Sequence, residues 1–219
     1  EAPAAQGAEA AAPSDQQAGS AGPVIAHSRA MRDVVAMMER VSEDGMAVLL
    51  VGEEGSGKEA LARALHEMGS RRVRPFVVEA CSGLSDALLE AALFGQRKGA
   101  FAGADRDKRG SIDRARGGTM YLDGAERIAP LTLDKVVQAY AARRVLPVGG
   151  IESVTWEARL VVGSSRPMPE LAERLGAVTI AVPPLRERRE DIPLHVDRVL
   201  AVVARETRAA KKRLDKRSL

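Results

Sequence analysis

The chain has 219 residues, of which 45% are hydrophobic and 3% aromatic, so it can bury an aliphatic core in one domain, or in one domain with a small appendage. A formal net charge of +3 and a pI near 9.2 do not by themselves indicate a nucleic-acid partner. The single Cys81 excludes an internal disulfide framework, and no apolar run approaches the roughly 20 residues that cross a bilayer, so we expect a cytoplasmic protein without a membrane partner. The first residue is Glu1 and not methionine, which suggests a fragment.

Strand and helix patterns alternate along the chain after an irregular start. Residues 1–22 are rich in Ala, Gly, Gln, Ser and Pro, which predicts a linker or disordered tail. From Ser28, a suitable N-cap, apolar residues recur at helical spacing to Val41. Later patterns predict strands at 47–51, 75–78, 117–123, 159–162 and 178–182, a turn or hairpin at 146–154, and helices at 58–65, 84–94, 131–144, 171–175 and from 191 onward. This alternation predicts an α/β fold with a parallel sheet.

A glycine-rich stretch, GEEGSGKE, follows the apolar run that ends at Val51. Glycines let the backbone turn tightly and direct several N–H groups at one anion, and the positive end of the next helix points to the same place. Lys58 would reach the β- and γ-phosphates of a nucleotide, although Glu59 stands where a magnesium-binding hydroxyl is expected. The alternative is a glycine turn without a ligand. The predicted nucleotide site comprises Gly52, Glu53, Gly55, Ser56, Gly57, Lys58 and Glu59.

The strand predicted in GGTMYLD ends in Asp123. An aspartate at the carboxyl end of a strand beside a phosphate loop can hold Mg²⁺, usually through water. The alternative is that Asp123 caps the following helix, and one side chain can do both. We therefore predict Asp123 as the metal residue.

Four motifs together resemble the AAA+ domain of bacterial sigma-54-dependent transcription activators, the enhancer-binding proteins. In chain order they are GEEGSGKE, LFGQRKGAFAGAD at 93–105, GGTMYLD and PPLRERREDIPL at 183–194. The similarity covers residues 24–203, and the family's phosphate loop also ends in GKE, which accounts for Glu59. The resemblance implies an AAA+ P-loop NTPase, usually a hexameric ring, that uses ATP and Mg²⁺ to remodel sigma-54 RNA polymerase holoenzyme.

The resemblance also implies roles for particular residues. Asp123 and Arg174 would be catalytic, with Arg174 reaching the γ-phosphate of a neighbouring subunit. The loop that contacts sigma-54 would be GAFAGA, which comprises Gly99, Ala100, Phe101, Ala102, Gly103 and Ala104. Phe101 would lie at its tip; the alternative is an aromatic folded back onto its own domain. Ala102 replaces the family's threonine, which puts engagement of sigma-54 in question.

Other positions depart from the family at the catalytic centre. Gly124 replaces a glutamate that polarises the attacking water, and Ala80 replaces the asparagine that holds this glutamate. Ser165 replaces an asparagine that senses the nucleotide. The family has a second arginine that reaches the neighbouring subunit, and its position in this chain falls near Met168. A missing general base costs on the order of 10²–10⁴-fold in rate, and a missing arginine finger about 10³–10⁵-fold.

These departures lead to the expected function and organisation. We predict a degenerate AAA+ domain of a transcriptional regulator that binds ATP or ADP, hydrolyses ATP weakly or not at all, and acts through nucleotide binding, homo-oligomeric assembly or partner contacts. The alternative is an active ATPase that remodels the sigma-54 holoenzyme. Residues 23–190 would form the core, and 191–219 only the beginning of the helical lid with a basic tail. We expect no DNA-reading element within this chain.

Overall fold

A sheet of five parallel strands organises the computed structural model, which describes residues 24–208, 210 and 212. The strands are β1 (Val48–Val51), β2 (Phe76–Ala80), β5 (Thr119–Asp123), β8 (Arg159–Ser164) and β9 (Val178–Ala181). Their order is β2-β5-β8-β1-β9, and every adjacent pair is parallel. The predicted parallel α/β sheet is confirmed. The linker predicted at 1–22 and most of the basic tail lie outside the described residues.

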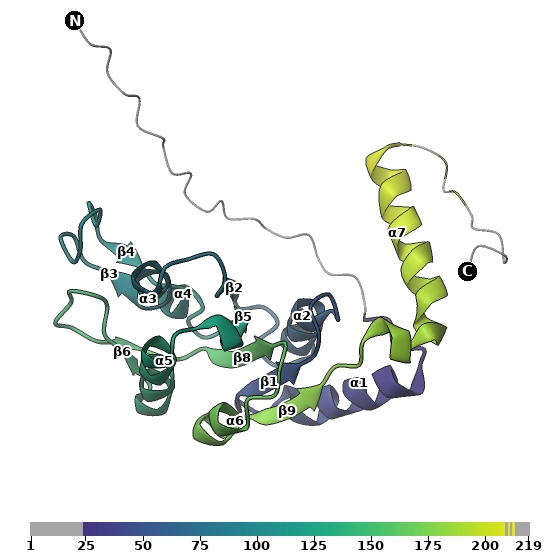
Figure 1. Cartoon of the computed structure of the whole chain (residues 1–219), viewed down its shortest axis with the longest axis horizontal. Helices are drawn as coiled ribbons and strands as arrows, with labels where there is room; N and C mark the ends of the chain where they lie inside the picture. Colours follow the sequence, from purple (N-terminus) through teal and green to yellow (C-terminus); the bar gives the residue numbers. More distant parts are fainter. Residues whose placement is uncertain (1–23, 209, 211, 213–219) are drawn as a thin grey trace, which may run out of the picture.

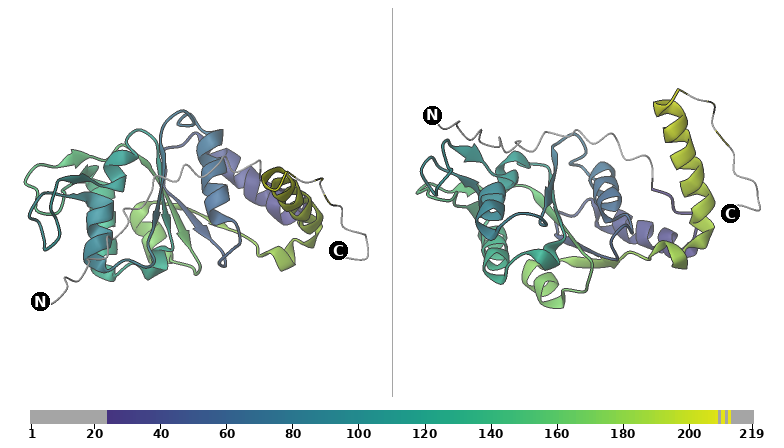
Figure 2. Two further views of the ribbon diagram at one scale, coloured as in Figure 1. Left: turned by 90° about the horizontal axis from the view of Figure 1, so that it is seen from above. Right: turned by 45° about the horizontal axis from the view of Figure 1, so that its top comes forward.

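Helices cover both faces of the sheet (Figures 1 and 2). They are α1 (Arg29–Ser42), α2 (Lys58–Met68), α3 (Asp86–Phe94), α4 (Ser111–Arg114), α5 (Pro130–Ala142), α6 (Pro169–Leu175) and α7 (Ile192–Glu206). Three short 3₁₀ turns are η1 (Ala125–Arg127), η2 (Leu185–Glu187) and η3 (Arg189–Asp191). None of the helices in the described part of the chain is long and apolar enough to cross a membrane.

The alternation of side chains along the strands divides the core into two clusters. On β1, Val48 and Leu50 face α1 and α2, where they pack with Met38 and Leu65. Leu49, between them, faces the opposite cluster, which includes residues of α3, α5 and α6. Successive strand residues point to opposite faces, so a continuous apolar run such as Val48–Val51 serves a sheet that is buried on both sides.

The start of α1 is bound to a residue far along the chain. Ser28 caps the helix, and its hydroxyl accepts a hydrogen bond from Met31 N at 3.3 Å. The fully buried carboxylate of Asp191 accepts bonds from Ser28 N at 2.7 Å, Ser28 Oγ at 2.8 Å and His27 N at 2.9 Å. The segment that leads into α7 is thereby fixed against the start of α1.

The end of α1 is bound to the central strand. Arg159, the first residue of β8, is buried and donates to the carbonyl oxygens of Val41 at 2.6 Å, Ser42 at 2.9 Å and Met46 at 3.1 Å. The last carbonyls of a helix lack intrahelical partners, and a cation there also opposes the negative end of the helix dipole. Arg159 therefore satisfies groups that burial would otherwise leave unpaired.

Two small hairpins project at the other end of the sheet (Figure 1). The strands β3 (Gly95–Gln96) and β4 (Lys108–Arg109) enclose the GAFAGA loop, and β6 (Arg144–Val145) and β7 (Val154–Thr155) form the hairpin predicted at 146–154. Arg97 N donates to Val148 O at 3.0 Å and Val148 N donates to Gly95 O at 2.9 Å, so the two hairpins touch.

Candidate functional site

The phosphate loop joins β1 to α2 at the carboxyl edge of the sheet. Gly55 and Gly57 have φ values of +75° and +94°, which side chains rarely tolerate. A Cβ on Gly52 would lie 2.7 Å from Val182 O, so the close approach of β9 also requires glycine there. Because α2 begins at Lys58, the first N–H groups of the helix have no intrahelical acceptor and point toward the loop. The loop therefore has the geometry of an anion site.

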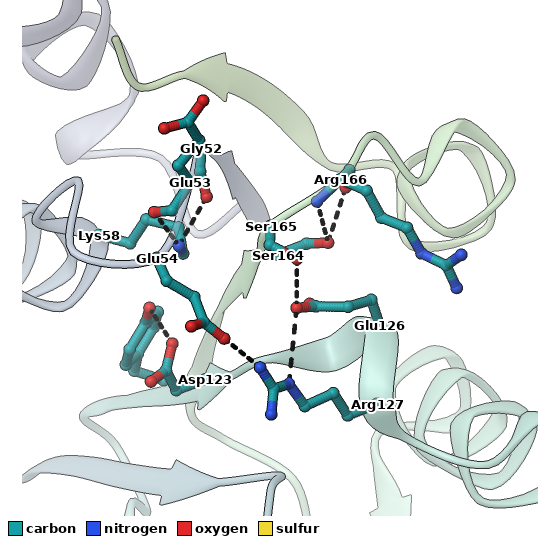
Figure 3. Close-up of polar contacts among 11 residues, drawn as sticks. Gly52, Glu53, Glu54, Lys58, Asp123, Glu126, Arg127, Ser164, Ser165 and Arg166 are labelled. Atoms are coloured by element: carbon teal, nitrogen blue, oxygen red, sulfur yellow. Dashed lines mark hydrogen bonds and ion pairs between the residues drawn. The ribbon is translucent and has the colours of Figure 1, made fainter. Parts of the chain in front are cut away.

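The Lys58 side chain is mostly buried against this loop. Its Nζ donates to Gly52 O at 2.7 Å and to Glu53 O at 2.9 Å (Figure 3). The neighbouring Glu59, at the start of α2, lies 3.4 Å from Arg63 and points along the helix surface. Ser56 is buried, and its Oγ has no hydrogen-bond partner among the described residues. The loop thus offers one ammonium group and one unpaired hydroxyl.

Two arginines from the PPLRERREDIPL motif form hydrogen bonds with the phosphate loop. Arg186 pairs with the Glu53 carboxylate through two contacts of 2.7 Å, and hydrogen bonding to this guanidinium holds the pKa of Glu53 below its ordinary value. Arg188, buried behind the loop, donates to Ser56 O at 2.7 Å. The sequence predicted the motif but not these contacts, because a separation of more than 130 residues leaves no local pattern.

Asp123 ends β5 beside the loop, as predicted. Its Oδ1 accepts a hydrogen bond from Tyr121 Oη at 2.9 Å. Burial raises the pKa of Tyr121 far above its ordinary value, with a further contribution from the charge of Asp123, so the phenol keeps its proton and donates it. Gly163 on β8 leaves room for the phenol, because a Cβ there would collide with it. One carboxylate oxygen is thus oriented by Tyr121 and the other remains for a metal or its water.

Glu126 and Ser165 connect the ends of β5 and β8. Ser165 Oγ donates to Glu126 Oε1 at 2.6 Å, while Glu126 Oε2 is buried and has no hydrogen-bond partner within the described chain. Burial raises the pKa of Glu126, but hydrogen bonds from Ser165 and nearby groups lower it by more, so the pKa lies below its ordinary value. Glu126 is therefore a carboxylate at neutral pH. From the sequence we expected the Glu126 side chain to approach the attacking water from a different direction than a side chain at position 124 would.

Gly124 adopts a left-handed conformation with φ +78° and ψ +45° at the start of η1. The side chain of Arg127 lies over it: a Cβ on Gly124 would be 3.7 Å from Arg127 Cδ. The Arg127 guanidinium forms an ion pair with Glu54 of the phosphate loop, and its Nε lies 4.0 Å from Glu126 Oε1 (Figure 3). No sequence pattern indicates a role for Glu54 or Arg127, because these two residues come together only when the fold brings η1 next to the phosphate loop.

The other predicted residues lie away from this cluster. Arg174 on α6 pairs with Asp134 of α5 at 2.6 Å, where both side chains are 45% exposed. In the GAFAGA loop, Gly99 and Gly103 have positive φ, Ala102 is exposed and Ala104 is buried. Phe101 is partly buried, so its ring is less exposed than the resemblance implied. These residues lie on α6 and in the GAFAGA loop, away from the phosphate loop.

Cys81 and a shallow hollow complete the surroundings. The Cys81 thiol is buried, and burial together with nearby carboxylates raises its pKa to about 12, so it does not provide a nucleophile. A hollow of about 450 Å³ lies between the start of the described chain and α7. Its lining is mainly apolar and comprises Val24, Ile25, Ala26, His27, Leu194 and Arg198.

The comparison with protein families decides the assignment. The model of the sigma-54 interaction domain matches residues 24–176. The chain belongs to this family. The family resemblance and the α/β AAA+ P-loop NTPase fold predicted from the sequence are both confirmed.

Known relatives of this sigma-54 interaction domain are transcriptional regulatory proteins. The chain is 39% identical over 187 residues to the Nif-specific regulatory protein of Herbaspirillum seropedicae, covering 81% of the chain and 34% of that protein. It is 40% identical over 180 residues to the transcriptional regulatory protein ZraR of Klebsiella oxytoca, covering 78% and 41%. The chain thus spans less than half the length of these relatives.

A solved structure with the same fold is NtrX from Brucella abortus in complex with ATP. Its TM-score to this chain is 0.79 at 26% sequence identity, and the match covers 89% of this chain and 44% of NtrX. The ADP complex of NtrX gives a TM-score of 0.78.

Proposed function

We propose that this sigma-54 interaction domain binds ATP or ADP with Mg²⁺, hydrolyses ATP weakly or not at all, and serves a transcriptional regulator through nucleotide-dependent assembly or partner contacts. The observation that carries the proposal is the contrast within one site. The phosphate loop keeps Lys58, Gly55 and Gly57 in an anion-binding arrangement, whereas Gly124 supplies no carboxylate beside Asp123.

Nucleotide binding is supported by the arrangement of polar and apolar surfaces. The N–H groups at the start of α2 and the Lys58 ammonium would bind the phosphates. The apolar hollow beside α7 suits a nucleobase, and the adjoining Asp191–Ser28 contact and the Arg188–Ser56 contact connect its walls to the loop. In NtrX the same fold is seen with ATP and with ADP.

A magnesium ion would be held by the phosphates, by water and by Asp123. Magnesium prefers oxygen ligands and keeps several waters, so one protein carboxylate beside a polyphosphate suits it. The Asp123 carboxylate fits, because Tyr121 engages one oxygen and leaves the other. The ion would neutralise phosphate charge near Asp123 and Glu126.

Partner contacts and assembly are inferred from the family. The GAFAGA loop is available at the far end of the sheet for sigma-54, and Arg174 is exposed for a neighbouring subunit of a ring-shaped homo-oligomer. In this loop the exposed residue 102 is alanine, and the Phe101 ring is partly buried, which leaves less side-chain surface for the sigma-54 contact.

A second candidate function is an ATPase that remodels the sigma-54 holoenzyme. One observation favours it: Glu126 is ionised, held by Ser165 and carries an oxygen without a partner in the described chain. This carboxylate would orient the attacking water from η1 in place of a residue at 124. Under this candidate, Glu126→Gln abolishes phosphate release while nucleotide affinity stays within about twofold, since Glu126 would contact the attacking water and not the nucleotide.

The deciding experiment measures nucleotide affinity by calorimetry and phosphate release on the same preparation, over a range of protein concentrations. Binding with little release supports the proposed function, and concentration-dependent release that Glu126→Gln abolishes supports the second candidate. If the wild type binds neither nucleotide, both are wrong.

Lys58→Ala tests the phosphate loop directly. Loss of a charged hydrogen-bond donor should weaken ATP and ADP binding roughly 10- to 100-fold, corresponding to about 1.5–3 kcal/mol. The matched control is Lys135→Ala, which removes an ammonium group that pairs with Glu90 at 2.7 Å on the α3–α5 surface. Equal affinity in Lys58→Ala and the wild type would contradict an anion site at this loop.

A further inference from the structure

We propose that Arg127 binds the terminal phosphate of ATP by exchanging its partner Glu54 for the nucleotide, so that the site distinguishes ATP from ADP through a cation on η1. This inference rests on the proposed nucleotide binding and deepens it. It assigns to Arg127 a phosphate contact, and to Glu54 the role of holding the guanidinium at the loop.

The position of the guanidinium is the first support. Arg127 follows Asp123 on the same turn, and its side chain passes over the bare backbone of Gly124 to reach the phosphate loop. Its partner Glu54 stands within the loop, between Gly52 and Lys58 in sequence. Figure 3 shows Arg127 between the Asp123 side and the Glu126 side of the site. A group that reaches Glu54 is therefore at the edge of the anion site.

The Arg127 side chain lies beside the backbone of Gly124. A Cβ at 124 would be 3.7 Å from Arg127 Cδ and 3.9 Å from Arg127 Nε, which is ordinary van der Waals contact, so a longer side chain at 124 would lie next to the guanidinium. The position at which a carboxylate would stand is thus adjacent to a guanidinium.

The strength of the Glu54 ion pair is the second support. The Arg127 and Glu54 side chains are 50% and 75% exposed, and ion pairs in such surroundings are weak because water competes with them. A phosphate group carries more charge than one carboxylate and accepts two parallel hydrogen bonds from a guanidinium. A phosphate group would therefore compete effectively with Glu54 for the Arg127 guanidinium.

The charge balance of the site is the third support. Glu54, Asp123 and Glu126 place three carboxyl groups around the carboxyl ends of β1 and β5 (Figure 3). Lys58 lies inside the loop, bonded to Gly52 O and Glu53 O, and would reach the β- and γ-phosphates from that side. Arg127 lies on η1, outside the phosphate loop, where its guanidinium would contact the third phosphate of ATP. ADP does not extend to it.

The test compares MgATP and MgADP affinities by calorimetry, with phosphate release followed in parallel, in the wild type, Arg127→Gln, Glu54→Gln and the double variant. Arg127→Gln should weaken ATP roughly 3- to 10-fold, a range scaled down for an exposed contact, and change ADP by less than about twofold. Glu54→Gln, which frees the guanidinium, should strengthen ATP binding relative to ADP.

The double variant separates a phosphate contact from mere neutralisation of Glu54. If Arg127 binds phosphate, Arg127→Gln still weakens ATP roughly 3- to 10-fold when introduced into Glu54→Gln. If it has no effect in that background, Arg127 only neutralises Glu54 and the inference is wrong. Arg116→Gln is the control, because Arg116 pairs with Glu157 at 2.9 Å at the opposite edge of the sheet.

The outcomes also distinguish this inference from the proposed function. A wild type that binds both nucleotides, with an Arg127→Gln variant that binds them equally well, overturns only the role of Arg127. A wild type that binds neither overturns both. An equal loss of ATP and ADP in Arg127→Gln also contradicts the inference, because it indicates a general effect on the loop.

Discussion

Gly124 is the residue on which the proposal of weak or absent hydrolysis depends most. Its left-handed backbone, with φ +78°, begins the η1 turn and lets Arg127 fold back toward the phosphate loop. The absence of a carboxylate at 124 therefore coincides with a left-handed backbone and a neighbouring guanidinium. A single substitution at 124 would leave both of these features in place.

Gly124→Glu should fail to restore rapid hydrolysis and should lower stability. A side chain in the left-handed region costs about 1–2 kcal/mol, and the new carboxylate would emerge beside the Arg127 guanidinium and pair with it. Denaturant unfolding and phosphate release, measured on the same variant, check both parts. The control is Gly124→Asn, which tolerates this conformation better and should lose less stability.

A rise in phosphate release of more than about 10²-fold in Gly124→Glu would contradict this prediction, since it is the gain expected from a functional general base. It would also show that Ala80 and Met168 are no obstacle to catalysis.

The residues of the phosphate loop could be predicted because their chemistry is encoded within eight consecutive positions. Glycines, Lys58 and a preceding apolar strand are a local signal, and so is Asp123 at the end of another strand. The contacts of Glu53 and Glu54 could not be predicted in the same way. Their partners, Arg186 and Arg127, come from η2 and η1, and one glutamate or arginine in sequence looks like any exposed charge.

At the scale of elements, the contact between η3 and α1 joins parts far apart in the chain. Asp191 ends η3, just before α7, and binds the N-cap Ser28 and His27 N. The sequence predicted a helix start at both places, but not that one carboxylate joins them. The α7 helix has no buried side chain among its described residues, so this junction, and not packing, fixes its base.

Asp191→Asn should lower the free energy of unfolding by about 1–3 kcal/mol at neutral pH, because charge-assisted hydrogen bonds become neutral ones. Burial raises the pKa of Asp191, but hydrogen bonds from Ser28 and His27 lower it by more, to below its ordinary value. The advantage of the wild type is therefore full above about pH 4 and disappears as the pH falls through the lower native pKa. Urea unfolding from pH 7 to pH 2 measures the difference.

The control for this experiment is Asp33→Asn on the exposed side of α1, which should change stability by less than about 0.5 kcal/mol at neutral pH. A difference between wild type and Asp191→Asn that stays constant down to pH 2 would show that the Asp191 charge does not stabilise the junction.

The elements that sequence patterns missed are the shortest ones. The central strands have four to six residues, enough for an apolar run to stand out. The strands β3 and β4 have two residues each and lie in a polar stretch, so no periodicity exists to detect. Their pairing depends on the neighbouring hairpin, whose Val148 bonds to both Gly95 and Arg97.

At the scale of the whole molecule, the phosphate loop between β1 and α2 lies between the GAFAGA loop at one end and α7 at the other (Figure 1). Arg174 lies on the exposed surface of α6, where it pairs with Asp134 and not with the phosphate loop of its own chain. The proposed catalytic role of Arg174 requires a second subunit, which makes assembly the property to measure.

Arg174→Ala should reduce assembly that depends on MgATP, observed as a smaller sedimentation coefficient than that of the wild type at the same concentration. Nucleotide affinity at low protein concentration should stay unchanged, because Arg174 does not contact its own loop. Asp134→Asn is the matched control: it breaks the same 2.6 Å ion pair and keeps the guanidinium, so assembly should persist. Equal assembly of Arg174→Ala and wild type would exclude a role for Arg174 between subunits.

The left-handed backbone at Gly124 also bears on how this lineage can change. Every glycine codon can become a glutamate or an aspartate codon by one nucleotide substitution, so mutation alone can supply a carboxylate. Selection would meet that variant first as a strained turn in which Arg127 neutralises the new charge. Recovery of a catalytic glutamate at 124 would require earlier changes in η1, and in their absence natural descendants of this domain should retain glycine there.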